Sequence, residues 1–553
     1  MNKHLSPIFL IISFLPLYLF AQSPAIPESI KANIRARIDN GENQNIIIGV
    51  IDEKGKHYYS YGYISGKTKI APKKYTLYEI GSISKVFTSL ALAQATIEEK
   101  CRIEDPLDAY LPEGLALNLY EGSPILLKHL SNHSSGLPVV PDNMPMADPG
   151  NPYADYDRDL MNEFLQSYQL TRSPENKFEY SNLAVGLLGE LLADLEGISY
   201  EAMIAEKICK PLGMDNTTLS LNEDQKLRLS PGHKGSKEVA NWELGSMAGA
   251  GGIRSTASDM LNFLIYQMSM QSSSLSKAMK LSQKGTFALN QSDSVALGWF
   301  IKQSADSKII WHNGETGGYH SFLGFDKAKK RGIVVLANTA ISIDDIGFHY
   351  LDPNLPLKEI KEVKKLGIES LDALVGVYEL ALGREIQVRR KDLQLSAQLT
   401  GQSPFEIYPE SESRFFLRQV DAEIEFSKNE QGEIESLTLY QNGFEQLAKR
   451  TDKEVSELLE KVAIELPQSE LKKFVGTYDL APGIQFFVSQ KEAQLYVKLT
   501  GQGSLPVYPL SKNRFFYKAV EAEIEFELSE KGEVLSLTLF QNGLENKAKK
   551  KRE

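Results

Sequence analysis

The sequence contains few of the residues that build metal and disulfide sites. Its 553 residues include two cysteines, Cys101 and Cys209, and eight histidines. Two cysteines are too few for a disulfide framework and lack the spacing of a zinc site. No His-Glu-x-x-His sequence occurs either, which argues against a metalloenzyme. We therefore expect no metal and no cofactor, and the sequence leaves open whether the two cysteines pair.

The chain also lacks an excess of positive charge. It has 61 Lys and Arg against 72 Asp and Glu, which gives a formal net charge of −11 at pH 7. Nucleic-acid binding depends on Lys and Arg side chains that neutralise phosphates. The one basic run, 547–552, is more typical of a solvated chain end. We expect no nucleic-acid partner, and the oligomeric state stays open.

Long apolar runs are missing after the first 20 residues. Lys3 and His4 precede an apolar stretch, 8–20, that is followed by Ala21. A short basic start, an apolar core and a small final residue indicate a secretory signal peptide over 1–21. The alternative is a membrane anchor, but the stretch is interrupted and shorter than the about 20 residues that span a bilayer. We expect a periplasmic or secreted protein without a membrane span in the mature chain.

The last part of the chain repeats itself. Residues 371–450 and 471–550 align without a gap at an offset of 100, with 40 identities in 80 positions. Apolar and polar residues alternate in each copy, as over 393–399 and 493–499, which is typical of strands with one buried face. Turn signals separate these runs, so each copy is expected to form a small barrel or sandwich. Apolar residues at helical spacing over 455–462 predict a short helix between the copies.

The larger unit that precedes the repeats mixes strands and helices. The apolar patterns predict strands at 46–51, 58–63, 295–301, 309–313, 322–325 and 333–337, and helices at 83–98, 160–169, 182–195 and 258–268. Strands at both ends with helices between them predict one sheet with a helical subdomain beside it. A cleft between these two parts is the expected place for a site.

The first motif that suits chemistry is Gly81-Ser82-Ile83-Ser84-Lys85, at the start of an apolar helix. Ser82 and Lys85 are one helical turn apart, so their side chains share a face. A serine hydroxyl becomes a nucleophile when a nearby base takes its proton, and a buried amine that is forced neutral can be that base. The helix start adds free backbone N–H groups for an oxyanion. Alone, this motif is common by chance and is more typical of an N-capped surface turn.

Two further motifs carry suitable groups. Tyr-Ser-Asn at 180–182 places a phenol, which can relay protons, two residues from an amide that can hold an acyl carbonyl. His-Asn-Gly-Glu at 312–315 ends an apolar strand whose edge can hold an extended substrate and donate an N–H group to an oxyanion. Taken alone, the two motifs are also typical of a core tyrosine beside a helix cap and of a glycine-rich turn.

Together and in this order, the three motifs resemble the Ser-x-x-Lys, Tyr-x-Asn and Lys-Thr-Gly signature of class C β-lactamases and penicillin-binding proteins. The resemblance covers about 35–345 and includes flanking segments such as 129–138 and 251–256. It implies an α+β fold in which an antiparallel sheet is flanked by helices with a helical subdomain. Two small all-β barrel-like domains follow, and a catalytic domain with such a tail resembles D-aminopeptidases of the same superfamily.

The expected domains are the signal peptide at 1–21, a hydrolase domain at 22–350, and two barrel-like repeats at 351–452 and 453–553. Within the hydrolase domain, the resemblance implies an acyl-enzyme on Ser82. Lys85 and Tyr180 resemble the coupled base and proton relay. The backbone N–H groups of Ser82 and Glu315 would form the oxyanion hole. The implied substrate-binding residues are Asn182, His312, Asn313, Gly314 and Glu315.

One departure from the family pattern concerns the substrate. The lysine of the third motif is His312 here, and Glu315 follows the motif directly. A largely neutral imidazole beside an acid suits a substrate carboxylate less than a permanent cation does. We therefore expect an esterase or a D-amino-acid-type peptidase, acting on a small molecule or a peptide, rather than an efficient β-lactamase. The alternatives are a true β-lactamase or DD-peptidase, and a non-catalytic envelope protein that only binds a ligand.

Other candidate sites are weaker. No Gly-x-Ser-x-Gly sequence occurs, so the nucleophile turn of α/β-hydrolases is absent. Residues 249–252 lack the third spaced glycine of a dinucleotide-binding loop and are expected to form a turn. His133 and His320 are expected to be structural. The Pro- and Asp-rich segment 139–157 is expected to be a surface excursion that can cover the cleft.

Overall fold

The computed structural model describes residues 25–551, with short gaps at 66–68, 146–147, 149, 382, 403, 419, 457–460, 462, 492, 501, 503, 519, 521, 530 and 542–543. The predicted signal peptide and most of the helix expected at 455–462 lie outside the described residues. Within the part of the chain that is described, no helix has the length and apolar character that a membrane span requires.

The first unit contains an eight-stranded antiparallel sheet in the order β2-β1-β12-β11-β10-β9-β8-β7. Its strands are β1 (Asn45–Asp52), β2 (Gly55–Gly62), β7 (Phe287–Ala288), β8 (Ser294–Val295), β9 (Phe300–Gln303), β10 (Lys308–Glu315), β11 (His320–Asp326) and β12 (Arg331–Ala337). The prediction of one continuous strand over 295–301 is wrong, because the segment contains the end of β8, a turn and the start of β9. Ala296 N–H donates to the Trp299 carbonyl at 2.8 Å and closes a turn between β8 and β9. The apolar run misled the prediction because this turn is itself buried.

Both faces of the central strands are covered. Alternate residues of β1 and β12, such as Ile46 and Val335, pack with α1 (Glu28–Asp39) and α11 (Asp344–Leu351). Their neighbours, such as Ile47 and Val334, pack on the other face with α2 (Ser84–Ile97), α9 (Ala257–Gln267) and α10 (Ser276–Ser282). This double burial explains why these strands are continuous apolar runs in the sequence.

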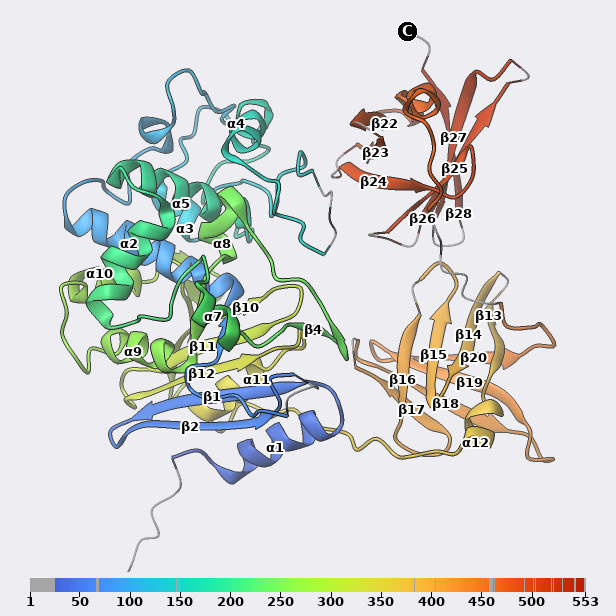
Figure 1. Cartoon of the computed structure of the whole chain (residues 1–553), viewed down its shortest axis with the longest axis horizontal. Coiled ribbons are helices and arrows are strands. Elements are labelled where there is room, and N and C mark those ends of the chain that lie inside the picture. Colours follow the sequence, from blue (N-terminus) through green and yellow to red (C-terminus); the bar gives the residue numbers. More distant parts are fainter. Residues whose placement is uncertain are drawn as a thin grey trace, which may run out of the picture.

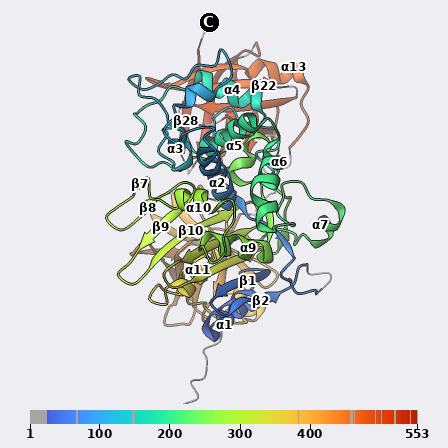
Figure 2. The same cartoon turned by 90° about the vertical axis from the view of Figure 1, so that its left-hand side faces the viewer.

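The remaining helices lie mostly between β3 and β7 in the chain and form the helical part beside the sheet (Figures 1 and 2). They are η1 (Gly81–Ile83), η2 (Leu107–Tyr110), α3 (Leu127–Ser131), α4 (Arg158–Ser167), α5 (Asn182–Glu196), α6 (Tyr200–Ile204), η3 (Ala205–Cys209), η4 (Lys210–Leu212), α7 (Glu223–Arg228), η5 (Gly245–Met247) and α8 (Ala248–Gly251). Two small sheets pair β3 (Leu77–Glu79) with β6 (Arg254–Thr256), and β4 (His233–Lys234) with β5 (Lys237–Glu238). The prediction of a turn at 249–252 is wrong, because residues 249–251 belong to helix α8.

Each copy of the repeat forms a closed antiparallel barrel of eight strands. The first barrel has α12 (Ile368–Asp372), β13 (Gly376–Ala381), β14 (Arg384–Lys391), β15 (Gln394–Leu399), β16 (Phe405–Pro409), β17 (Arg414–Leu417), β18 (Ala422–Lys428), β19 (Ile434–Gln441) and β20 (Phe444–Arg450). The second has α13 (Gln468–Leu471), η6 (Lys472–Phe474), β21 (Gly476–Ala481), β22 (Ile484–Lys491), β23 (Gln494–Leu499), β24 (Ser504–Pro509), β25 (Arg514–Tyr517), β26 (Ala522–Leu528), β27 (Val534–Gln541) and β28 (Leu544–Lys550).

The alternating pattern of the repeats fills the barrel interiors. Leu395 is buried in the first barrel and Leu495 in the second. Leu393, which the pattern also included, is 66% exposed because it precedes β15 in a turn. The predicted α+β fold with two following β-barrels is confirmed.

The barrels stand beside the first unit, the first near the sheet and the second near the helical part (Figure 1). In the first barrel, Arg418 donates to the Asn40 carbonyl at the end of α1. In the second, Lys498 forms an ion pair with Asp142 at 2.5 Å. Asp142 belongs to the predicted surface excursion 139–157, so this segment contacts the second barrel.

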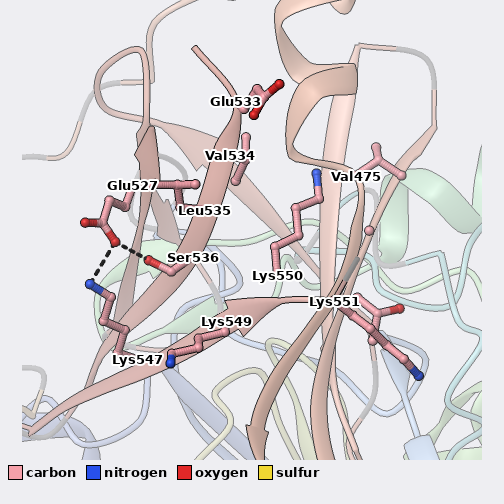
Figure 3. Close-up of a pocket in the computed structure, with 12 residues that line it drawn as sticks. Val475, Glu527, Glu533, Val534, Leu535, Ser536, Lys547, Lys549, Lys550 and Lys551 are labelled. Carbon is pink, nitrogen blue, oxygen red and sulfur yellow. Dashed lines mark hydrogen bonds and ion pairs between the residues drawn. The ribbon is translucent and has the colours of Figure 1, made fainter. Parts of the chain in front are cut away.

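A cavity of about 990 Å³ opens on the second barrel (Figure 3). Its lining is rich in lysine, and Glu527 pairs there with Lys547 at 2.7 Å. None of the residues that the sequence marks for catalysis lines it. Size therefore does not identify the candidate active site, which is defined below by its chemistry.

Candidate active site

Ser82 and Lys85 meet where the turn η1 runs directly into helix α2. The Lys85 Nζ atom lies 2.9 Å from Ser82 Oγ. The same nitrogen donates hydrogen bonds to Asn182 Oδ1 at 2.8 Å and to the Ala250 carbonyl at 2.7 Å. The predicted pair therefore shares one face, and the second motif and α8 supply the other partners of the amine.

The protonation state of Lys85 follows from its burial. Its side chain is fully buried, and burial holds the pKa of the amine well below its ordinary value of 10.5. A neutral amine has two N–H groups and one lone pair, whereas Asn182 Oδ1 and the Ala250 carbonyl can only accept. These two oxygens take the two N–H groups. The lone pair of Lys85 is left for the hydroxyl proton of Ser82.

Tyr180 lies over this pair. Its ring centroid is 4.8 Å from Lys85 Nζ. Burial raises the pKa of the phenol, and the nearby Ser82 hydroxyl opposes that shift only in part. The phenol is therefore neutral at ordinary pH and keeps a proton that it can donate. Tyr180 is in place to exchange a proton with Ser82.

The loop that carries Tyr180 is fixed from two sides. Ser181 caps helix α5 by accepting a hydrogen bond from Ala184 N–H at 2.9 Å. His133 Nδ1 accepts the Ser181 N–H at 3.1 Å, and its ring packs on Tyr180 with centroids 4.3 Å apart. Burial lowers the pKa of His133, in keeping with a neutral ring that accepts at Nδ1. These contacts agree with the structural role expected for His133.

Strand β10 packs against η1 through two glycines. A methyl group on Gly314 would lie 2.0 Å from the Ile80 carbonyl oxygen and 2.9 Å from Ser82 N. Gly81 has φ +50°, and a methyl group there would lie 2.8 Å from Glu315 N. A side chain at either position would separate the two backbones. The glycines thus bring Ser82 N and Glu315 N close to each other.

The N–H group of Glu315 points away from β11. Glu315 is opposite His320 in the register, and the next residue, Thr316, donates to the Tyr319 carbonyl at 3.1 Å. Hydrogen-bonded and non-hydrogen-bonded pairs alternate along an antiparallel ladder, so the Glu315–His320 pair is not hydrogen-bonded. On the other side, β9 pairs with β10 only as far as Trp311. The Glu315 N–H is therefore directed toward η1, where it can serve an oxyanion.

His312 lies near Tyr180, with the two ring centroids 6.5 Å apart, and, like Tyr180 and Lys85, it is not among the residues that line the cavity of Ser82. Burial lowers the pKa of His312 to about 3, so the ring is neutral, and it packs beside Phe300 with centroids 5.3 Å apart. Asn313 donates to Asp344 at 2.7 Å. The structure thus places Asn182 and Glu315 at the cavity, whereas His312, Asn313 and Gly314 do not line it.

Several lining residues were not predicted from the sequence. The cavity is about 30 Å³ in volume and is lined by Ser82, Tyr153, Asn182, Trp242, Leu244, Met247, Ala250, Gly251, Glu315 and Thr316. Tyr153 accepts a hydrogen bond from Asn182 Nδ2 at 3.3 Å and packs against Trp242 with centroids 5.4 Å apart. Tyr153 lies in the predicted excursion 139–157, so part of that segment borders the site. Its motion as a lid stays a prediction.

The described chain offers neither a cluster of metal ligands nor a disulfide bond. No group of three or more His, Cys, Asp or Glu side chains there could hold a metal ion. Cys101 and Cys209 are both buried and unpaired.

Comparisons with known proteins identify the family of the first unit. A family model described as "Beta-lactamase" matches residues 30–348, more than half of the chain. The chain belongs to the β-lactamase family. Its resemblance to this family, inferred above from three motifs, is confirmed. A domain of unknown function matches the barrel region twice, over 361–454 and 460–551.

Two relatives have names that refer to penicillin binding and to D-alanyl-D-alanine peptidase activity. Penicillin-binding protein 4* of Bacillus subtilis is 29% identical over 444 residues, covering 71% of this chain and 92% of that protein. The D-alanyl-D-alanine-carboxypeptidase/endopeptidase AmpH of Escherichia coli is 29% identical over 302 residues, covering 52% of this chain and 77% of that protein.

Solved structures of the family share the fold. The octameric penicillin-binding protein homologue from Pyrococcus abyssi matches with a TM-score of 0.54 at 21% identity, over 76% of this chain and 99% of that chain. A class C β-lactamase from Rhodobacter sphaeroides matches with a TM-score of 0.52 at 23% identity, over 59% of this chain and 99% of that chain. At such identities the likeness concerns the fold alone.

Proposed function

We propose that this β-lactamase-family hydrolase cleaves an ester or amide bond through an acyl-enzyme on Ser82. The observation that carries the proposal is the contact between Lys85 Nζ and Ser82 Oγ at 2.9 Å. The amine is buried, and its two N–H groups are held by acceptors, so its lone pair faces the hydroxyl group. This is the arrangement that a serine nucleophile needs from its base.

Acylation would begin when Ser82 Oγ attacks the carbonyl carbon of the substrate. Its proton passes to the neutral amine of Lys85, and the carbonyl oxygen becomes an oxyanion. The N–H groups of Ser82 and Glu315 would stabilise that charge. When the tetrahedral intermediate collapses, the bond to the leaving alcohol or amine breaks, and that group takes up the proton from Lys85 through Tyr180.

Deacylation would reverse the order of these steps with water. Water loses a proton to the Tyr180–Lys85 pair as it attacks the acyl carbon of the enzyme ester. The ester bond to Ser82 Oγ then breaks, the serine regains a proton, and a carboxylic acid leaves. Asn182 would hold the acyl group, since its Oδ1 is fixed by Lys85 and its Nδ2 faces the cavity beside Tyr153.

The substrate we propose is an ester or a D-amino-acid-type peptide rather than a β-lactam. His312 is buried and neutral, so it offers no charge for a substrate carboxylate. The name of the AmpH relative, a carboxypeptidase and endopeptidase, supports amide chemistry. The second candidate function is that of a true β-lactamase or DD-peptidase. It is supported by the similarity to a β-lactamase of Escherichia coli, which is 25% identical over 355 residues.

We also propose that the enzyme works outside the cytoplasm, in the periplasm or secreted. The proposal rests on the basic and apolar pattern of 1–21 and leaves a mature chain with a hydrolase domain at 22–350 and barrels at 351–452 and 453–553. The N-terminal residue of the protein purified from the native host tests it. A mature chain that begins near Gln22 is expected, and an intact Met1 in an exclusively cytoplasmic fraction would contradict the proposal.

Labelling with a fluorophosphonate tests the catalytic proposal. Wild type is expected to gain one adduct by intact mass, and Ser82→Ala none. Ser84→Ala is the matched control, because its hydroxyl accepts the Ile253 N–H at 3.0 Å and belongs to the core. It should still be labelled. A wild-type protein that forms no adduct and hydrolyses no ester, D-amino-acid p-nitroanilide or nitrocefin would instead be a non-catalytic binding protein.

A further inference from the structure

We propose that Asp344, the first residue of α11, is a positioning residue for the oxyanion hole of the proposed reaction. Through Asn313 and His320 it fixes the end of β10, whose Glu315 N–H group is directed toward the oxyanion. The inference rests on the proposed function, because it concerns the acylation of Ser82. It adds a residue that does not line the cavity and acts on the reaction through its neighbours.

The end of β10 has two faces with different neighbours. Successive residues of a strand face opposite sides, so Gly314 faces one side, and Asn313 and Glu315 face the other. The Gly314 side packs on the turn η1, since a methyl group there would lie 2.0 Å from the Ile80 carbonyl oxygen. On the other side, Phe322, which is opposite Asn313 in the register, packs in the same apolar cluster as α11. A contact from α11 therefore restrains the strand on the side opposite η1.

Asp344 reaches this side of the strand with both carboxylate oxygens. Its Oδ2 atom accepts a hydrogen bond from Asn313 Nδ2 at 2.7 Å, and its Oδ1 atom lies 3.0 Å from His320 Nε2. Because Asn313 belongs to β10 and His320 to β11, one carboxylate connects both strands to the start of α11. Glu315 and His320 are the last pair of the two strands, and the backbone forms no hydrogen bond at that pair. The side-chain contacts supply the restraint there.

His320 extends the contact to Glu315 itself. Its Nδ1 atom lies 3.6 Å from Glu315 Oε2, so the imidazole stands between the carboxylates of Glu315 and Asp344. Burial lowers the pKa of this ring, but its contacts with the two carboxylates outweigh burial and raise the pKa from 6.5 to about 9. At neutral pH the ring is therefore a cation that attracts both side chains. A row of three charges thus connects α11 with the residue that carries the proposed oxyanion donor.

Asp345, the next residue of α11, has a contact of similar strength that points elsewhere. It pairs with Arg37 of α1 at 2.6 Å, and Arg37 also contacts Asn33 and the Ser342 carbonyl. Both carboxylates stand in the first turn of one helix, where the helix dipole favours negative charge. Loss of either charge should weaken the attachment of α11, but we expect only the loss at Asp344 to disturb the oxyanion hole.

The kinetics of fluorophosphonate labelling at Ser82, followed by intact mass over a range of probe concentrations, test the inference. In Asp344→Asn the maximal rate at saturating probe should fall about 10-fold, less than the about 10²- to 10³-fold that the loss of one oxyanion donor costs. The half-saturating concentration should stay within about twofold of wild type, because the oxyanion contact strengthens in the transition state and not in the first complex. Asp344→Glu, which keeps the charge, should recover part of the rate.

Asp345→Asn is the matched control. Its thermal transition should fall, but its labelling rate should equal that of wild type, since Asp345 contacts α1 and not β10. If Asp344→Asn does not fold, Asn313→Ala and His320→Gln, which each remove one of the two contacts, replace it, and both should label more slowly than wild type.

Three results would overturn the inference alone: an equal loss of rate in Asp344→Asn and Asp345→Asn, a change confined to the half-saturating concentration, or wild-type rates in the folded variants of Asp344, Asn313 and His320. Absence of labelling in wild type would overturn the proposed function as well.

Discussion

At the scale of single residues, the proposed activation of Ser82 depends on a neutral amine at Lys85. A lysine in water holds three protons on Nζ and cannot accept a fourth. Burial lowers the pKa of Lys85 because desolvation penalises the charged form, so this amine gives up a proton more readily than a lysine in water. Two acceptors that cannot donate then orient the remaining N–H groups. The direction of the lone pair is therefore a consequence of the neighbours of Lys85, not of its own flexibility.

Replacing Lys85 should slow acylation. In Lys85→Ala the hydroxyl proton has no nearby amine, so we expect a loss of about 10²- to 10⁴-fold in the rate of fluorophosphonate labelling, the usual contribution of a general base. The rate is measured by stopping the labelling reaction at successive times and determining the labelled fraction from the intact mass of the protein. Lys226→Ala, which removes an exposed lysine of α7, is the control. Unchanged acylation in a folded Lys85→Ala protein would reject the base role.

His320 should make stability depend on pH in the alkaline range. Despite burial, its contacts with Asp344 and Glu315 raise the pKa of the ring from 6.5 to about 9. A raised pKa means that the folded state favours the proton, so the stabilisation is fully present below about pH 6.5 and is lost as pH rises through 9.

Thermal unfolding of wild type and His320→Gln at several pH values checks this prediction. The stability difference should be of the order of 1–3 kcal/mol near pH 6 and should shrink by pH 10. A difference that grows with pH would contradict the assignment of His320 as a cation.

The contact between Ser82 and Lys85 could be predicted from the sequence, but the residues that surround this pair could not. Ser82 and Lys85 are local to one helical turn, so spacing alone predicts their contact. Tyr153 and Trp242 come from irregular segments 89 residues apart in the numbering of the chain, and their packing depends on tertiary structure. Ala250 contributes a carbonyl group, which every residue has, so no side-chain pattern marks it.

At the scale of secondary structure elements, the contact between β10 and η1 builds the site. The strand ends at Glu315, beyond the last residue that β9 pairs with, and the edge left open receives the turn that carries Ser82. Long apolar runs predicted β1, β10, β11 and β12 correctly, because both faces of the sheet are buried. The same signal failed over 295–301, where a buried turn is as apolar as a strand.

Adding one methyl group at this contact should impair acylation. Gly314→Ala would place a carbon atom 2.0 Å from the Ile80 carbonyl oxygen, so β10 and η1 must separate. We expect a loss of about 10²- to 10³-fold in labelling rate, comparable to the loss of an oxyanion donor. Gly367→Ala is the control, since no atom lies within 4 Å of a methyl group there. Equal labelling of the two variants would show that the close contact is not needed.

At the scale of the whole molecule, three units have separate cores. The apolar clusters of the first unit include no described residue beyond Leu357, whereas those of the barrels begin at Leu366 and Leu466. All the lining residues of the candidate site lie between Ser82 and Thr316. Polar contacts join the units, such as the ion pair of Lys498 with Asp142.

A fragment over 25–360 should therefore fold and react. A unit with its own core and its own site does not require the barrels for either property. We expect a cooperative thermal transition and labelling at Ser82 within a factor of about three of the full chain, since an exposed ion pair such as Lys498–Asp142 contributes about 1 kcal/mol or less. A fragment that is unfolded, or folded but unreactive, would show that the barrels complete the site.

The most direct test of the central claim is the pH dependence of Ser82 acylation. Labelling rates for wild type, measured by intact mass from pH 5 to 11 with Ser82→Ala as the blank, should rise with one titration and level off well below 10.5, the ordinary pKa of a lysine. Lys85→Ala should lose that titration. A wild-type rate that keeps rising to pH 10.5, as an exposed lysine would, or a profile that Lys85→Ala leaves unchanged, would contradict the account.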